Sequence, residues 1–171
     1  MFTRRIKNRF LARLAAKWPY LSNRLTASFD TLQSGEIPWT EVIKPLNHSR
    51  IALVTTAGVH HRSQPKFNMA DRNGDPSFRV LDITTIENDY AITHDYYDHR
   101  DAEHDLNIIF PIARLKQMQA SGYLGEPARL HYSFMGHILG PYLDTLMGET
   151  APRVAARLKK DQVDAVLLTP A

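Results

Sequence analysis

The segment Arg50-Ile-Ala-Leu-Val-Thr-Thr-Ala-Gly58 constrains the fold more than any other part of the chain. Its apolar and β-branched residues predict a buried strand, and the closing glycine predicts a loop at the carboxyl end of that strand. Strands that are buried on both faces belong to sheets with helices packed around them. We therefore expect this segment to be the first strand of an α/β sheet.

Four further segments have the composition of strands, and two carry the signals of helices. The predicted strands are Phe78 to Ile83, Tyr90 to Thr93, Arg129 to Phe134 and Asp164 to Thr169. One predicted helix begins at Pro111 and stops at Gly122, and the other runs from Arg153 to Lys160. This alternation predicts the α/β class, as a Rossmann-like three-layer fold with a mostly parallel sheet. Because the sequence stops directly after a segment typical of a buried parallel strand, we expect that sheet to be incomplete at its C-terminus.

The first 36 residues are predicted to form a basic amphipathic helical arm. Apolar side chains recur there at four-residue steps, at Phe2, Ile6, Phe10, Leu14 and Trp18. Every charged residue before Asp30 is basic. Such a helix packs its apolar face on its own domain or a partner more often than it meets nucleic acid or a membrane, so we expect neither of the latter. Residues 37–171 then form the N-terminal portion of an α/β domain.

Composition restricts the class of protein and its chemistry. A length of 171 residues, with 43% hydrophobic and 23% charged, suits one globular domain. No apolar run has membrane-spanning length and no secretory signal is present, so we expect a cytoplasmic protein. The chain has no cysteine, which excludes disulfides, thiolate metal sites and thiol nucleophiles within these residues. Glycine-rich phosphate and dinucleotide loops are also missing.

The stretch from His94 to Asp105 is the strongest candidate for a functional site. It holds three histidines and five carboxylates within twelve residues. Ionised carboxylates are rarely buried without partners, so the stretch is expected at a cleft or loop. The alternative is structural, because Asp98 or Asp101 could simply cap the helix that follows. A metal site is not predicted, because histidines five residues apart fit neither a helical zinc motif nor a zinc finger.

Polar residues follow three of the predicted strands. They lie at residues 58–76, 94–105 and 133–137. In open α/β sheets, ligands bind outside the carboxyl ends of the strands. We therefore expect these three segments to converge on one crevice.

Six short segments, read in order, resemble a known family, the selenoprotein B subunits of the glycine, sarcosine, betaine and D-proline reductases. Together they span roughly residues 37–171. They are Ala52-Leu-Val-Thr-Thr-Ala-Gly58; Gly74-Asp-Pro-Ser-Phe-Arg79; Ile92-Thr-His94 with Tyr97-Asp-His-Arg-Asp101; Asn107 with Phe110-Pro111; His131-Tyr-Ser-Phe-Met-Gly136; and Asp164-Ala-Val-Leu-Leu-Thr-Pro170.

The resemblance implies reductive cleavage of a carbon to nitrogen bond in a small amino acid or amine. It also implies electrons from a thioredoxin-like dithiol donor and a pyruvoyl group carried by a partner subunit. In the family, the strand that resembles Val163 to Thr169 leads into a selenocysteine. We therefore expect a selenocysteine just after Ala171, at a UGA codon treated as a stop, and no reductase turnover by the 171 residues alone.

The resemblance also suggests roles for residues that this chain retains. His94, Asp98, His99 and Asp101 are candidate catalytic residues, because histidine titrates near neutral pH and a neighbouring carboxylate tunes it. Arg100, His131 and Ser133 are candidates for substrate binding, with Arg100 able to hold a carboxylate. Two alternatives remain open: Arg100 could pair with Asp98 or Asp101, and His131 could be a hydrogen-bonded histidine within a strand.

Two functions of other classes also fit the sequence. A metal-dependent hydrolase could be built on the His94 to Asp105 stretch. A non-catalytic binding module could use the basic arm to dock on a partner. A member of the reductase family remains the main prediction.

Overall fold

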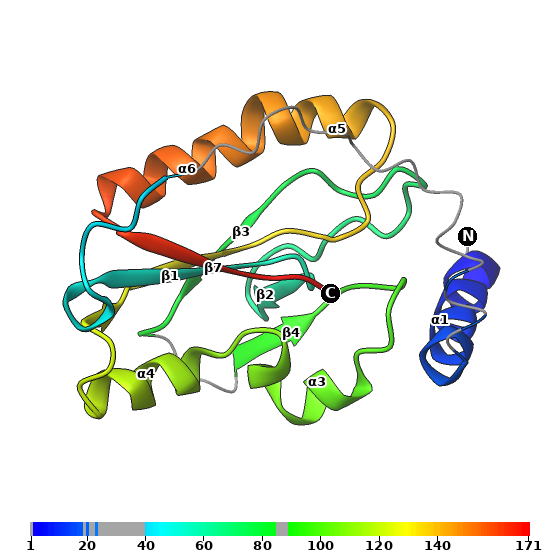
Figure 1. Cartoon of the computed structure of the whole chain (residues 1–171). Helices are drawn as coiled ribbons and strands as arrows, with labels where there is room; N and C mark the ends of the chain where they lie inside the picture. The colour runs from blue at the N-terminus through cyan, green and yellow to red at the C-terminus, as the bar shows by residue number, and fades with distance from the viewer. Residues whose placement is uncertain (1, 19, 21–22, 24–39, 85–88) are drawn as a thin grey trace.

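The computed structural model describes residues 2–18, 20, 23, 40–84 and 89–171. Most of the predicted elements are present, with bounds that differ by a few residues. In chain order they are α1 (Phe2–Lys17), the 3-10 turn η1 (Leu46–His48), β1 (Arg50–Thr55), β2 (Val59–His61), β3 (Arg79–Asp82), β4 (Tyr90–Ile92), α3 (Arg100–His104), the 3-10 turn η3 (Leu106–Ile108), α4 (Ile112–Ala120), β5 (Glu126–Pro127), β6 (Leu130–Ser133), α5 (Pro141–Thr145), the π-helical turn η4 (Leu146–Thr150), α6 (Ala151–Lys160) and β7 (Ala165–Thr169) (Figure 1).

Strand β1 is the centre of a mixed five-stranded sheet. On one side it pairs in parallel with β7, with Leu53 opposite Leu167. On its other side it changes partner along its length, from β5 at its start to β6 at its end, both parallel. Strand β3 joins the far side of β6 in the antiparallel direction, and β2 pairs with β4 in a separate antiparallel ribbon.

The α/β class is therefore confirmed, but the prediction of a mostly parallel sheet is wrong. A parallel neighbour needs a long crossover connection, usually a helix. No α-helix lies among the described residues 56–84 between β1 and the end of β3, so the chain folds back and β3 enters antiparallel to β6. The Rossmann-like three-layer arrangement is not confirmed, because β3 runs antiparallel to β6 and β2 pairs with β4 outside the main sheet.

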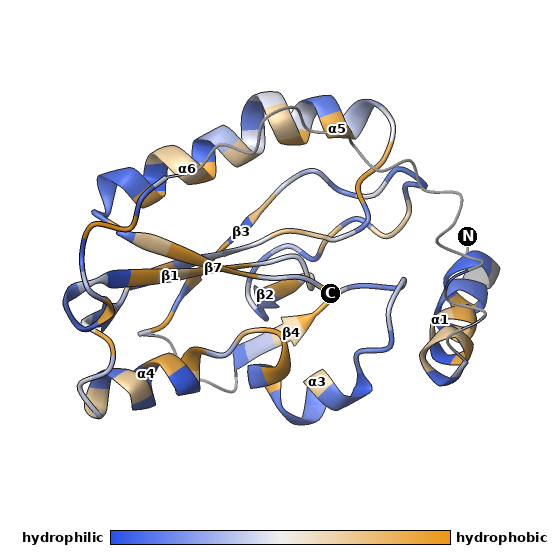
Figure 2. Cartoon of the chain, in the orientation of Figure 1, coloured by the Kyte–Doolittle hydropathy of each residue, from blue (hydrophilic) through white to orange (hydrophobic). Residues whose placement is uncertain are grey.

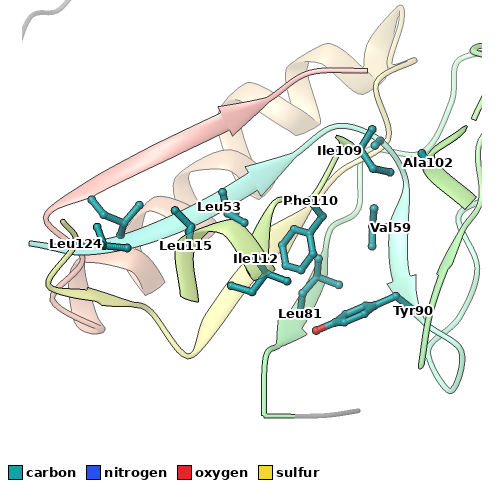
Figure 3. Packing of buried hydrophobic residues seen from close by; sticks show 12 residues of the cluster. Leu53, Val59, Leu81, Tyr90, Ala102, Ile109, Phe110, Ile112, Leu115 and Leu124 are labelled. Carbon is teal, nitrogen blue, oxygen red and sulfur yellow. The ribbon is translucent and has the colours of Figure 1, made fainter. Parts of the chain in front are cut away.

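Alternate residues of β1 contribute to two separate cores. Ile51 and Leu53 pack with residues of α4 and with Phe110, in a cluster that reaches Val59 and Tyr90 (Figure 3). Ala52 faces the opposite way and packs with residues of β6 and α6. The strand period of two thus directs one residue set to each face. Helices α4 and α6 lie on opposite sides of the sheet (Figure 1).

Strand β7 has the predicted parallel direction but is not buried. Hydrophobic residues colour it largely orange in Figure 2, yet Leu168 is 69% exposed. Val166 and Leu167 are also exposed. Among the described residues, β1 is its one strand partner, so the outer edge of β7 has no neighbour to bury these side chains.

Helix α1 does not pack on the domain in the predicted way. Ile6 is 54% exposed and Phe10 is 61% exposed, whereas Leu11 and Leu14 are half-buried, so only part of the apolar side is covered. The helix reaches the domain through arginines instead: Arg4 donates to the carbonyl of Met69 at 3.1 Å, and Arg5 binds Asp95. The predicted boundary between arm and domain, at residues 36 and 37, lies outside the described residues. None of the described helices is long and apolar enough to cross a membrane.

Candidate functional site

The three polar segments that follow strands do converge, as predicted. The amide of Gly58 donates to the carbonyl of Phe134 at 3.0 Å, which joins the ends of β1 and β6. The carbonyl of Gly58 accepts from the amide of Thr93 at 2.9 Å, which brings in the end of β4. Gly58 has φ of +71°, and a Cβ there would lie 2.5 Å from the Thr93 carbonyl oxygen. This position therefore requires glycine.

Gly136 brings the end of β7 to the same place. A Cβ on Gly136 would lie 2.9 Å from the carbonyl oxygen of Ala171, 3.1 Å from that of Thr56 and 3.5 Å from Nε2 of His94. The amide of Ala171 also donates to Oγ1 of Thr56 at 3.1 Å. The missing side chain thus lets the backbone after β7 approach a histidine from a different strand.

His94 is buried and its ring is fixed in orientation. Its Nδ1 accepts the amide hydrogen of Tyr96 at 3.1 Å, so a neutral ring carries its hydrogen on Nε2. That Nε2 is buried and has no hydrogen-bond partner among the described protein atoms. Burial lowers the pKa of His94 to about 4, with smaller contributions from His137 and His99. His94 is therefore a neutral hydrogen-bond donor at neutral pH, with its N–H facing the gap beside Gly136.

Two tyrosines support this histidine. The hydroxyl of Tyr97 donates to the carbonyl of Ala57 at 3.1 Å, and its ring meets the His94 ring edge to face at 4.7 Å between centroids. Burial raises the pKa of Tyr97 above its ordinary range, so it stays a donor. Tyr96 stacks on His137 at 3.8 Å. Sequence reasoning missed Tyr97 and His137, although Tyr97 lies inside the predicted stretch.

His99 lies behind His94 rather than beside it. It is buried, and its Nε2 is 3.1 Å from the carbonyl oxygen of His94. Its Nδ1 is 2.8 Å from a carboxylate oxygen of Glu103, but off the direction of a good hydrogen bond. His99 therefore holds the backbone at His94 in place.

Three of the predicted site residues, Asp98, Arg100 and Asp101, do not join His94. Arg100 binds Asp98 through both carboxylate oxygens, with Nη2 to Oδ2 at 2.5 Å, which is the alternative considered from the sequence. This contact lowers the pKa of Asp98 to about 2. Asp101 lies exposed in the first turn of α3. The side chains of Asp98 and Arg100 thus bind each other rather than line a cavity with His94.

His131 is a structural residue of the sheet. It is fully buried, and its Nδ1 accepts the amide hydrogen of Leu53 at 2.7 Å. Burial lowers its pKa to about 4, and its ring meets Phe110 edge to face. The alternative of a hydrogen-bonded histidine within a strand describes this geometry. Ser133 is also buried, and its hydroxyl makes one long contact, 3.4 Å to the carbonyl oxygen of Phe134.

A pocket of about 340 Å³ opens beside His94. Its walls come from the end of β4, from residues 66–70 and from α1. Asp95, next to His94, is a buried carboxylate in this pocket, and Arg5 of α1 binds it at 2.5 Å. Neither residue was singled out from the sequence. Asp95 lay in the acidic stretch, but no sequence signal joins residues that are 90 positions apart.

The described residues hold no group of three histidine, aspartate or glutamate side chains that could bind a metal ion. His94 has one unpaired nitrogen, and the described acidic and histidine side chains around it do not form such a group. A metal-dependent hydrolase therefore has no ligand set in this part of the chain.

Comparison with known proteins shows the family of the chain. The family model for glycine/sarcosine/betaine reductase selenoprotein B matches residues 12–171. The chain belongs to this family. The resemblance noted from short sequence segments is thereby confirmed, and the match extends into the N-terminal arm.

Named relatives place the chain among subunits of reductases. It is 40% identical over 131 residues to the D-proline reductase subunit gamma of Acetoanaerobium sticklandii, covering 77% of this chain and 52% of the relative. It is 30% identical over 135 residues to the glycine reductase complex component B subunit gamma of Carboxydothermus hydrogenoformans, covering 78% and 30%. A sarcosine reductase complex component B subunit beta of Peptoclostridium acidaminophilum is 23% identical over 137 residues, covering 78% and 30%.

The chain thus spans about half the length of the D-proline reductase subunit and about a third of the other two. These relatives are components of oxidoreductases with several subunits, as their names state. No solved structure gave a significant match.

Proposed function

We propose that this chain is part of a reductase subunit that cleaves the carbon to nitrogen bond of a small amino acid, with D-proline the first candidate. The carrying observation is the position of His94 Nε2, an unpaired buried donor within reach of Gly136 and the end of β7. The 40% identity to a D-proline reductase subunit supports this choice of substrate. Glycine, sarcosine and betaine are the further candidate substrates, because other relatives are named for their reduction.

In the overall reaction, the carbon to nitrogen bond breaks and the carbon gains a hydrogen. The nitrogen leaves as the protonated amine, and a dithiol supplies two electrons and becomes a disulfide. For cyclic D-proline this opens the ring to give 5-aminopentanoate. The electron donor that we propose is a thioredoxin-like dithiol protein, since no cysteine in this chain can supply the electrons.

The residues at the end of β7 fit a selenol next to His94. A selenocysteine following this strand would supply a nucleophilic anion there. His94 keeps its hydrogen on Nε2 and is neutral, so it can donate a hydrogen bond to such an anion without binding a proton itself. Thr56 and Gly136 hold the backbone in position for this contact. A pyruvoyl group, which activates the substrate amine, would belong to a partner subunit.

The test is to purify the assembled reductase through an affinity tag on this chain in the cells that encode it. The complex is supplied with dithiothreitol and with D-proline, glycine, sarcosine or betaine in separate assays, and the released amine is measured. We expect 5-aminopentanoate from D-proline. Failure of the complex to reduce any of the four compounds would contradict the proposal.

A His94→Phe variant in the same complex should lose most of the turnover, about 100-fold, because the donor to the reacting anion is removed. His94→Gln retains an N–H and should recover part of it. As a control, His104→Gln changes an exposed histidine of the same stretch and should leave turnover unchanged.

A further inference from the structure

Asp95 is a buried carboxylate whose counter-ion comes from a distant part of the chain. Its side chain is 3% exposed, and Arg5 of α1 binds both of its oxygens, with Nε to Oδ2 at 2.5 Å and Nη2 to Oδ1 at 3.2 Å. A second arginine, Arg9, comes within 4.0 Å. An ionised carboxylate that is buried this deeply needs a cation beside it. The position next to Asp95 is therefore a built cation site.

The cation that fills this site is itself reachable from solvent. The Arg5 side chain is 44% exposed, while Asp95 is not. Helix α1 touches the domain near this point through polar contacts, from Arg4 to the carbonyls of Met69 and Ala70. Among its apolar side chains, Ile6 and Phe10 are more than half exposed and add little to this attachment. Because Asp95 needs a cation but the guanidinium that supplies it is reachable from solvent, a ligand that brings its own cation can compete with Arg5 for this position.

The space around Asp95 suits a small zwitterion. The pocket of about 340 Å³ also contains His94 and two further cationic side chains, Arg9 and Lys66. This volume lies at the small end of ligand pockets. An ammonium group can take the place of the Arg5 guanidinium on Asp95, and Arg9 or Lys66 can meet a carboxylate. A ligand bound in this way shares its pocket with His94.

We propose that Asp95 binds the ammonium group of a small amino acid, and that Arg5 occupies this ammonium position in the free protein. Helix α1 thus covers the pocket until a ligand displaces it. That the ligand is a substrate such as D-proline rests on the proposed function. The ammonium site itself rests on Asp95, Arg5 and the pocket.

Titration calorimetry of the full chain tests this inference with D-proline, methylammonium and acetate. Removing the competing cation in Arg5→Gln should tighten the binding of D-proline and methylammonium by about tenfold relative to wild type. Asp95→Asn should abolish the binding of both. Acetate lacks a cationic group, so Arg5→Gln should not tighten its binding. Arg13→Gln removes the same charge from the same helix without contacting Asp95, and should behave as wild type.

A second measurement uses the wild-type chain and so does not depend on the folding of any variant. Displacement of Arg5 frees α1. D-proline should therefore speed trypsin cleavage after the basic residues of this helix between Arg4 and Arg9. Protection of α1 by D-proline would overturn the inference. Equal affinities of wild type and Arg5→Gln, or unchanged binding in Asp95→Asn, would also overturn it. Binding of methylammonium but not D-proline leaves the ammonium site standing and contradicts D-proline as the substrate.

Discussion

The imidazole of His131 accepts the backbone amide hydrogen of Leu53 at 2.7 Å, at the point where β1 passes from one neighbour to the next. Strand β5 pairs with β1 up to Ile51, and β6 pairs with it from Val54 onward. Between them the amide of Leu53 would be buried without a backbone partner. A side chain of β6 thus completes the hydrogen bonding of the central strand.

Replacement of this histidine should destabilise the fold. His131→Phe keeps a ring of similar size but leaves the Leu53 amide unpaired, so we expect the free energy of unfolding to fall by about 1–3 kcal/mol. Urea unfolding followed by circular dichroism measures this change. Ser133→Ala, on the same strand, removes a weak 3.4 Å contact and should cost about 1 kcal/mol or less. A His131→Phe variant as stable as wild type would contradict this role.

Gly136→Ala should impair the site more than the fold. The added methyl group would press on the carbonyl of Ala171 at 2.9 Å and that of Thr56 at 3.1 Å, so the backbone after β7 must move. We expect turnover of the assembled reductase to fall by about tenfold or more, because catalysis depends on placement within about 1 Å. Gly148→Ala is the matched control, since nothing lies within 4 Å of a Cβ there. Equal activity of the two variants would show that the approach of β7 to His94 is unimportant.

Stability should fall as the pH drops from about 6.5 to about 4. Burial lowers the pKa of His94 and of His131 to about 4, whereas both regain values near 6.5 on unfolding. In this interval the unfolded chain binds protons that the folded chain does not, so acid favours unfolding. Each pKa unit corresponds to about 1.4 kcal/mol, so the full interval amounts to about 3 kcal/mol for each of these histidines.

Urea unfolding at a series of pH values checks this expectation. His94→Gln removes one of these groups and should make the dependence on pH shallower over this interval. His48→Gln replaces an exposed histidine and should leave it unchanged. An unaltered slope in His94→Gln would refute the assignment.

Arg100→Ala should have little effect on either stability or turnover. Its guanidinium binds Asp98 at the surface, and exposed ion pairs contribute about 1 kcal/mol or less. The sequence had suggested a substrate contact for this arginine. A loss of substrate affinity in Arg100→Ala, measured as a raised KM of the reductase complex, would restore that role. Arg114→Ala, which removes an exposed arginine of α4, serves as the control.

Local patterns predicted the elements and the place of the site. The run from Arg50 to Gly58 is strand β1 and its loop, and Pro111 precedes α4 as expected. The rule that ligands bind at the carboxyl ends of strands predicted that three loops converge. In the structure these loops meet at Gly58 and Gly136. These features depend on neighbours in sequence and on the general geometry of sheets.

Long-range contacts could not be predicted. The direction of β3 depends on which edge of the sheet is free when the chain returns, and the sequence between β2 and β3 does not encode this. The pairing of Arg5 with Asp95 joins two segments with no shared pattern. The contact also turns Arg5, rather than Ile6 or Phe10, toward the domain.

Strand β1 supplies side chains to both cores, and this sharing governs how the molecule comes apart. Detaching the α4 side would strip Leu53 of its neighbours, and detaching the α6 side would do the same to Ala52. Neither core can unfold while the other stays folded, because both contain side chains of the same six-residue strand. Amide exchange along β1 should accordingly be the slowest in the molecule and require opening of the whole domain.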